Sequence, residues 1–185
     1  MRIIAGEYRG RRLASVGKGD PGAHLRPTTD RVRESLFNTL AGGRFGDPIS
    51  GARVLDLFAG TGALGLEALS RGAEHVTLVD DGRAAGKLIR ENIQTLGCKA
   101  ACKVIARDAT RLPQADTACG LIFLDPPYGK DLGGQALAVA QAGGWIAPEA
   151  LIVWEEEAAQ EAPAGFNLLD HKRYGDTWIS FLQVQ

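Results

Sequence analysis

Residues 54–65 limit the possible fold more than any other stretch of this sequence. They begin with an apolar run that contains Val54, and then place glycine at positions 60, 62 and 65. The run predicts a buried strand, and the glycines allow a tight turn. The apolar residues after the turn predict a helix that extends to about Arg71. A strand joined to a helix by a glycine turn indicates an α/β fold.

The spacing of Gly60, Gly62 and Gly65 matches the G-x-G-x-x-G pattern of dinucleotide-binding folds, which by itself is a weak signal. Asp56 favours another cofactor, because it lies inside the strand, where its carboxylate could hold an ammonium group. The chain also leaves little length for the catalytic domain of a nicotinamide dehydrogenase. S-adenosylmethionine, which carries an amino acid, therefore fits better than NAD.

Two further strands are predicted over residues 75–80 and 103–108, and each ends in an acid. Asp80 follows the glycines at about the sequence distance expected for an acid that holds ribose hydroxyls. Asp81 could take that role instead. Asp108 could accept a hydrogen bond from an adenine amino group, could cap a helical turn over 109–112, or could do both. A helix is predicted between these strands, over residues 83–96, with Gly97 at its end.

A fourth predicted strand, residues 121–124, runs directly into Asp125-Pro126-Pro127-Tyr128. Two prolines cannot continue a central strand, so a carboxylate, rigid carbonyl groups and an aromatic ring gather at its end. Ligands of open α/β sheets bind at such carboxyl ends. The motif suits methyl transfer to an amino nitrogen whose lone pair is delocalised, because hydrogen bonds can localise that pair and aim it. The alternative is a plain turn.

The C-terminal third predicts a helix over 132–142, a strand over 150–154 and a hairpin of residues 167–173 and 177–184. Glu155, Glu156 and Glu157 follow the predicted fifth strand, and we interpret them as a solvated strand end. We therefore expect a methyltransferase-like domain over residues 43–185.

Residues 1–42 predict a small basic appendage. A hairpin is expected over residues 2–13, and a helix over 31–40 that is capped by Thr29 or Asp30. Residues 1–33 contain eight basic and three acidic side chains, a net charge of +5, whereas the remaining residues sum to −6. This asymmetry favours contact with RNA phosphates over a merely solvated surface. The candidate RNA-binding residues are Arg9, Arg11, Arg12, Arg26, Arg31 and Arg33.

Other features narrow the class of protein. The three cysteines form no C-x-x-C pair, and with only three histidines they make a poor metal site, so we expect a reducing interior and no metal. No apolar run is long enough to cross a membrane, and no signal peptide is visible. We expect a cytoplasmic protein, and a monomer.

Taken together, four motifs resemble the bacterial 16S ribosomal RNA guanine-N2 methyltransferase family, within the class I S-adenosylmethionine-dependent methyltransferases. They are R-I-I-A-G-E-Y-R-G-R-R-L at residues 2–13, R-P-T-T-D-R-V-R-E-S-L-F-N at 26–38, D-L-F-A-G-T-G-A-L-G-L-E-A at 56–68, and D-P-P-Y at 125–128. The first two motifs are the more specific ones, because many amino-methylating enzymes share the others.

The resemblance implies a Rossmann-like fold, with a mostly parallel seven-stranded sheet and an antiparallel C-terminal hairpin. It implies methylation of the exocyclic N2 of a guanine in 16S rRNA within a small-subunit particle, with Asp125, Pro126 and Tyr128 as catalytic residues. The implied cofactor-binding residues are Asp56, Phe58, Gly60, Thr61, Gly62, Asp80, Asp108 and Asp125. A DNA adenine-N6 methyltransferase and a non-catalytic RNA-binding assembly factor are the alternatives.

Overall fold

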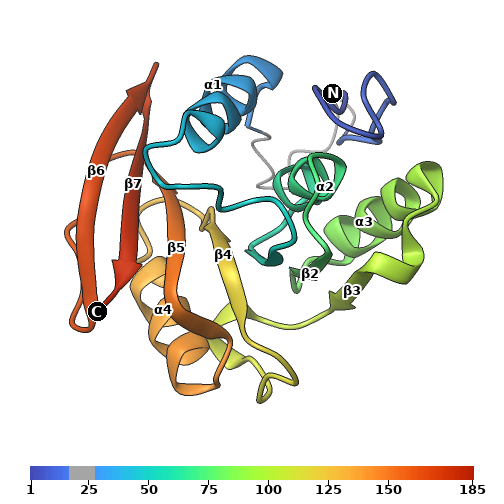
Figure 1. Cartoon of the computed structure of the whole chain (residues 1–185). Helices are drawn as coiled ribbons and strands as arrows, with labels where there is room; N and C mark the ends of the chain where they lie inside the picture. The colour runs from blue at the N-terminus through green and yellow to red at the C-terminus, as the bar shows by residue number, and fades with distance from the viewer. Residues whose placement is uncertain (17–27) are drawn as a thin grey trace.

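A computed structural model describes residues 1–16 and 28–185 of the chain (Figure 1). Its centre is a seven-stranded sheet in the order β3-β2-β1-β4-β5-β7-β6. The first five strands are parallel, and β7 pairs antiparallel with both β5 and β6. The predicted mostly parallel sheet with a C-terminal hairpin is therefore confirmed. The strands are β1 (Arg53–Leu57), β2 (His75–Val79), β3 (Cys102–Ile105), β4 (Cys119–Leu124), β5 (Ile146–Glu156), β6 (Phe166–Tyr174) and β7 (Thr177–Val184).

Helices cover both faces of the sheet (Figure 1). Three of them, α1 (Asp30–Ala41), α2 (Ala63–Ser70) and α3 (Arg83–Leu96), pack on one face, and α4 (Leu132–Ala142) packs on the other. Two short 3₁₀ turns, η1 (Lys99–Ala101) and η2 (Ala109–Arg111), flank β3. The bounds of α3 and α4 agree with the sequence prediction, and Thr29 caps α1 by accepting a hydrogen bond from the Val32 N–H.

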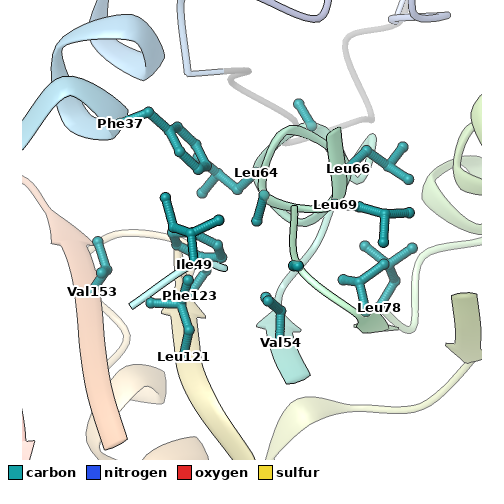
Figure 2. Packing of buried hydrophobic residues seen from close by; sticks show 14 of the residues in the cluster. Phe37, Ile49, Val54, Leu64, Leu66, Leu69, Leu78, Leu121, Phe123 and Val153 are labelled. Carbon is teal, nitrogen blue, oxygen red and sulfur yellow. The ribbon is translucent and has the colours of Figure 1, made fainter. Parts of the chain in front are cut away.

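The core consists of two apolar layers, one on each face of the sheet. Along β4, Leu121 and Phe123 point towards α1 and α2, whereas Ile122 and Leu124 belong to the layer beneath α4. Figure 2 shows the first layer, in which Phe37 of α1 meets Phe123 with ring centroids 5.7 Å apart. Because the parallel strands are buried on both faces, they read as continuous apolar runs rather than as alternating ones.

The N-terminal segment, residues 1–16, folds back on itself without forming strands. Its arms are joined by an isolated bridge between Arg2 and Arg12 and by backbone hydrogen bonds such as that from the Ile3 N–H to the Arg11 carbonyl oxygen at 3.0 Å, while other backbone groups bond to α2. The N–H groups of Ile4 and Ala5 donate to Glu67 of α2, at 2.8 and 3.1 Å. Gly6 has a φ of +84°, and a Cβ there would lie 1.8 Å from the Ser70 carbonyl oxygen, so this close approach requires glycine.

Several strand bounds differ from the prediction: β4 and β5 begin earlier, at Cys119 and Ile146, and β3 and β5 end elsewhere. β3 stops at Ile105, so Asp108 stands in the turn beyond it and not on the strand. β5 continues to Glu156, because Glu155 and Glu156 pair with Ile179 and Trp178 of β7. These two residues are only 6% and 7% exposed. The interpretation of these two acids as a solvated strand end is therefore wrong, although Glu157 is exposed.

In the part of the chain that the structure describes, each helix is too short or too polar to cross a bilayer.

Candidate active site

The strand register brings several of the predicted site residues to one edge of the sheet. Leu57 at the end of β1 lies opposite Val79 of β2 and Leu124 of β4, and Leu124 lies opposite Trp154 of β5. The residues that follow these strand ends, including Asp80 and Asp125, therefore meet at the carboxyl edge. The chain runs from β1 outward to β3, and then returns to place β4 on the other side of β1. Ligands of open α/β sheets bind at such a switch point.

The turn between β1 and α2 is a tight glycine turn, as predicted. Gly60 has a φ of +59° and Gly62 a φ of +79°, values in the left-handed region that favours glycine. Phe58 also has a φ of +59°, a conformation that is costly for an aromatic residue and that suggests a functional constraint. The turn is held by the Ala59 N–H, which donates to the Val79 carbonyl oxygen at 2.9 Å, and by the Gly62 N–H, which donates to the Ala59 carbonyl oxygen at 2.7 Å.

Asp56 lies beneath the first turn of α2 and is 1% exposed. Its Oδ2 accepts a hydrogen bond from the Gly65 N–H at 2.9 Å. The pKa of Asp56 is raised to about 7, mainly by burial and also by the carboxylate of Asp80, against the lowering effect of that hydrogen bond. A positive charge nearby would favour its ionised form. The contact with a cofactor ammonium group stays a prediction.

Asp80, and not Asp81, touches the glycine turn. Its Oδ2 accepts from the Gly60 N–H at 2.9 Å, and its Oδ1 from the Gly82 N–H at 2.8 Å. Burial raises the pKa of Asp80, whereas the side chain of Asp81 is exposed. These contacts favour Asp80 as the acid for the ribose hydroxyls, a role that stays a prediction.

Asp108 caps η2, as one of its two predicted roles requires. Its Oδ1 accepts from the N–H of Thr110 at 2.8 Å and from the Thr110 hydroxyl at 2.7 Å. The hydrogen bond from the Thr110 N–H is the main cause that lowers the pKa of Asp108. The contact with an adenine amino group stays a prediction.

The Asp125-Pro126-Pro127-Tyr128 segment begins where β4 ends, as predicted. The Asp125 N–H donates to the Leu57 carbonyl oxygen at 3.4 Å, which ties the segment to the end of β1. Pro126 is buried, Asp125 is partly exposed, and the Tyr128 hydroxyl lies 3.4 Å from Oγ1 of Thr177. Burial raises the pKa of Asp125 well above its usual range, and the carboxylates of Glu155, Asp56 and Glu156 add to this effect.

The predicted RNA-binding arginines differ in their surroundings. Arg9, Arg12 and Arg31 are exposed, and Arg26 lies outside the described residues. Arg11 is exposed too, but its Nη1 donates to the carbonyl oxygens of Thr95 and Leu96 at 3.2 Å, at the end of α3. Arg11 therefore anchors the N-terminal segment to α3, in addition to any contact with RNA.

The prediction that Arg33 continues the basic surface is wrong, because its side chain is fully buried. Its guanidinium forms ion pairs with Asp30 at 3.0 Å and with Glu67 at 3.7 Å, and donates to the Arg2 carbonyl oxygen. Arg33 stands at the i, i+3, i+4, i+7 spacing with Leu36, Phe37 and Leu40, so it lies on the buried face of α1, which the N-terminal segment and α2 also cover. Helical periodicity was therefore a usable signal for its burial, although not for the partners that compensate its charge.

Sequence reasoning missed two residues near the site. Asn92 of α3 is fully buried, and its Nδ2 donates to the carbonyl oxygens of Thr61 at 2.9 Å and Ala14 at 3.2 Å. It thereby joins the glycine turn to the N-terminal segment, and no pattern in the sequence reveals this link. The other missed residue is Glu155, which lies beside Asp125 and accepts a hydrogen bond from the Thr28 hydroxyl at 3.0 Å. Its position directly after the predicted strand of residues 150–154 was a usable signal.

Comparison with known proteins reveals similar sequences in several bacteria. The chain is 43% identical over 163 residues to Ribosomal RNA small subunit methyltransferase D of Escherichia coli, which covers 88% of this chain and 78% of the relative. It is 38% identical over 181 residues to the protein of the same name from Haemophilus influenzae, with 95% and 89% covered.

Solved structures agree with the fold. A provisionally named methyltransferase of Escherichia coli, yhhF, has a TM-score of 0.83 at 40% identity, with 100% of this chain and 98% of that chain covered. A 16S rRNA N2 G1207 methyltransferase of Thermus thermophilus, solved with AdoMet and guanosine, has a TM-score of 0.65 at 19% identity, with 86% and 44% covered. The second likeness concerns the fold alone.

The family model described as Conserved hypothetical protein 95 matches residues 1–183, nearly the whole chain. The match includes the N-terminal segment, the glycine turn and the Asp125–Tyr128 motif. The chain therefore belongs to the Conserved hypothetical protein 95 family and is similar throughout to the bacterial methyltransferases D of small-subunit ribosomal RNA.

Proposed function

We propose that this protein transfers a methyl group from S-adenosylmethionine to the exocyclic N2 of a guanine in 16S rRNA. The names of its relatives support the reaction and the class of RNA. The observation that carries the proposal is the position of Asp125-Pro126-Pro127-Tyr128, which lies beside the glycine turn at the switch point of the sheet. A methyl donor in that turn would be adjacent to an amino group held by the motif.

The residues at the edge fit the proposed cofactor. Gly60 and Gly62 let backbone come close to it, with Phe58 and Thr61 in the same turn. Asp80 would accept hydrogen bonds from ribose hydroxyls, and Asp108 from the adenine amino group. When bound, S-adenosylmethionine supplies a methyl group that is activated by a positively charged sulfonium. Positive charge there would favour the ionised forms of the buried carboxyl groups, which burial otherwise disfavours.

The motif would prepare the guanine amino group for attack. The N2 lone pair is delocalised into the ring, so N2 is a poor nucleophile. Asp125 would accept one N2–H and the Pro126 carbonyl oxygen the other, which turns the lone pair towards the methyl group. Tyr128 would stack on the base, and the base must be unpaired or flipped out of a helix to enter. Positioning for in-line displacement supplies much of the rate, and the methylated nitrogen loses its proton late.

The substrate in this proposal is rRNA within a small-subunit particle. There, the shape of protein and RNA can add to the binding that a modest basic surface provides. The enzyme acts in the cytoplasm as a monomer and uses no metal. Sedimentation of the purified protein tests the oligomeric state. The absence of a metal requirement is tested by measuring activity in excess EDTA, with ribosomal particles pre-equilibrated to constant free magnesium. We expect full activity.

The reaction is tested with tritiated S-adenosylmethionine and separate samples of small-subunit particles, naked rRNA, DNA and total protein. Labelled products are digested to nucleosides or amino acids and identified. The proposal expects N2-methylguanosine from 16S rRNA. N6-methyladenine in DNA would overturn the substrate. Bound cofactor with no incorporation into any sample would favour a non-catalytic assembly factor.

A further inference from the structure

Glu155 occupies the position on β5 that corresponds to Asp125 on β4. The two strands are parallel neighbours, and Leu124 lies opposite Trp154, so the next residue of each strand is Asp125 or Glu155. Both follow an apolar run and both stand at the carboxyl edge of the sheet. Glu155 is thus next to the proposed amino-binding acid, on the side away from the glycine turn of β1.

The setting of Glu155 is unusual for a glutamate. Only 6% of the residue is exposed, and it remains in the sheet through pairing with Ile179 of β7. Its Oε2 accepts a hydrogen bond from the Thr28 hydroxyl at 3.0 Å. The electrostatic interaction between the carboxyl groups of Glu155 and Asp125 disfavours two negative charges there. A ligand that donates hydrogen bonds to both acids would stabilise this arrangement.

Guanine presents two adjacent hydrogen-bond donors that could meet these two acids. Its Watson–Crick edge carries N1–H next to the N2 amino group, whereas adenine has an N1 lone pair next to its amino group. A carboxylate opposite N1 would attract guanine and repel a purine with an N1 lone pair. Buried polar sites of this type discriminate strongly, because the wrong base leaves a buried group unpaired.

We propose that Glu155 accepts the N1–H of the target guanine while Asp125 accepts an N2–H, and that Glu155 thereby selects guanine over purines that lack the N1 proton. The inference rests on the proposed function, and it adds a residue that determines the base. Glu155 touches the substrate in this arrangement, and its bond to Thr28 fixes the position of the carboxylate.

The test uses 2-aminopurine, which has the 2-amino group but a lone pair at N1. Once the methylated guanine is located, rRNA with guanine or 2-aminopurine at that position is assembled into particles. Wild-type enzyme should strongly prefer guanine in kcat/KM. Glu155→Gln can donate an amide N–H to N1, so the preference should fall by about 10-fold or more, with a gain in absolute activity on 2-aminopurine.

The matched control is Glu157→Gln, which makes the same change at an exposed glutamate two residues further along the chain and should retain the guanine preference. Cofactor affinity and urea unfolding check that each variant folds. If Glu155→Gln proves unstable, Glu155→Ser serves instead, and it should lose guanine preference without gaining activity on 2-aminopurine.

An unchanged guanine preference in folded Glu155 variants would overturn this inference alone. Wild-type enzyme that leaves guanine N2 unmethylated in every RNA sample would overturn the proposed function, and this inference with it.

Discussion

At the residue scale, the site is defined by carboxyl groups whose pKa values are raised. Burial is the main cause for Asp56, Asp80 and Asp125 alike, and neighbouring carboxylates add to it in each case. A folded protein that holds such acids binds protons more tightly than its unfolded chain does. Its stability must therefore fall as pH rises through the range between the unfolded and the folded pKa.

Asp56 allows a direct measurement of this effect. An unfolded aspartate titrates near pH 4, whereas the folded pKa of Asp56 is about 7. The stability contributed by its proton is complete below about pH 4 and is lost as pH rises to about 7. Asp56→Asn does not titrate and keeps an acceptor for the Gly65 N–H. The variant should therefore gain stability relative to wild type between about pH 4.5 and 7.5, by roughly 4 kcal/mol at most.

Urea unfolding of both proteins at a series of pH values measures this difference, and the subtraction cancels the acids that do not interact with Asp56. A constant difference between wild type and variant across the range would mean that Asp56 does not carry a raised pKa. Asp176→Asn, which makes the same change at an exposed acid in the turn between β6 and β7, serves as the control.

Asp125 should matter to turnover more than to cofactor binding. If it holds the target amino group, Asp125→Ala removes an interaction that aligns the nucleophile, and kcat should fall about 10²- to 10⁴-fold. The Kd for S-adenosylmethionine should change far less. Rapid-quench kinetics and calorimetry measure the two quantities. Equal losses in both would assign Asp125 to the cofactor or to the fold instead.

At the element scale, α2 lies very close to β1 and β2. A Cβ at Gly65 would lie 2.6 Å from Cγ2 of Val76 and 3.0 Å from Oδ2 of Asp56, both of which belong to packed strands. Gly65→Ala should therefore push α2 and its glycine turn away, at a cost of about 1–3 kcal/mol, and should weaken cofactor binding. Gly120→Ala on β4 is the matched control, because a Cβ there meets nothing within 4 Å. Similar stability and cofactor affinity in the two variants would contradict this packing argument.

Glu67 joins the N-terminal segment to α2 through a buried network. Its carboxylate accepts from the backbone of Ile4 and Ala5 and pairs with Arg33 and Arg71. Glu67→Ala would leave the buried Arg33 with less compensation, which should cost about 3–5 kcal/mol. Urea unfolding measures the loss, and trypsin cleavage after Arg9 or Arg12 in native buffer should become faster. Glu74→Ala, at an exposed acid, should change neither, and unchanged cleavage in Glu67→Ala would show that the segment is held by other contacts.

Elements that depend on local pattern could be predicted from the sequence, whereas contacts between distant segments could not. The apolar periodicity and the terminal glycine define α3, and the prolines after Leu124 define the end of β4. The polar partners of the buried Arg33 and the extension of β5 to Glu156 depend on segments far away in the chain, namely the N-terminal segment, α2 and β7. The site residues at strand ends could be predicted from the sequence because the strands themselves could be. The link through Asn92 could not be predicted in this way.

At the scale of the whole molecule, charge and architecture favour one side for RNA. Residues 1–33 carry a net charge of +5 on a chain whose total is −1. The N-terminal segment packs beside α2 and α3 (Figure 1), and Asn92 connects it to the carbonyl oxygen of Thr61 in the glycine turn. Phosphates bound by this segment would therefore lie on the same part of the molecule as the proposed methyl-transfer site.

The salt dependence of RNA binding tests this arrangement. Each phosphate that a basic side chain neutralises releases counterions, so the slope of log Kobs against log salt concentration reflects the number of such contacts. Arg9 and Arg12 are exposed on the N-terminal segment, and replacing both with alanine should reduce the slope by roughly one to two. Lys103→Ala with Arg111→Ala removes the same charge from exposed positions around β3 and η2, and should leave the slope nearly unchanged. Filter binding of small-subunit RNA at several salt concentrations measures both. Equal reductions in the two double variants would show that overall charge, and not the N-terminal segment, holds the RNA.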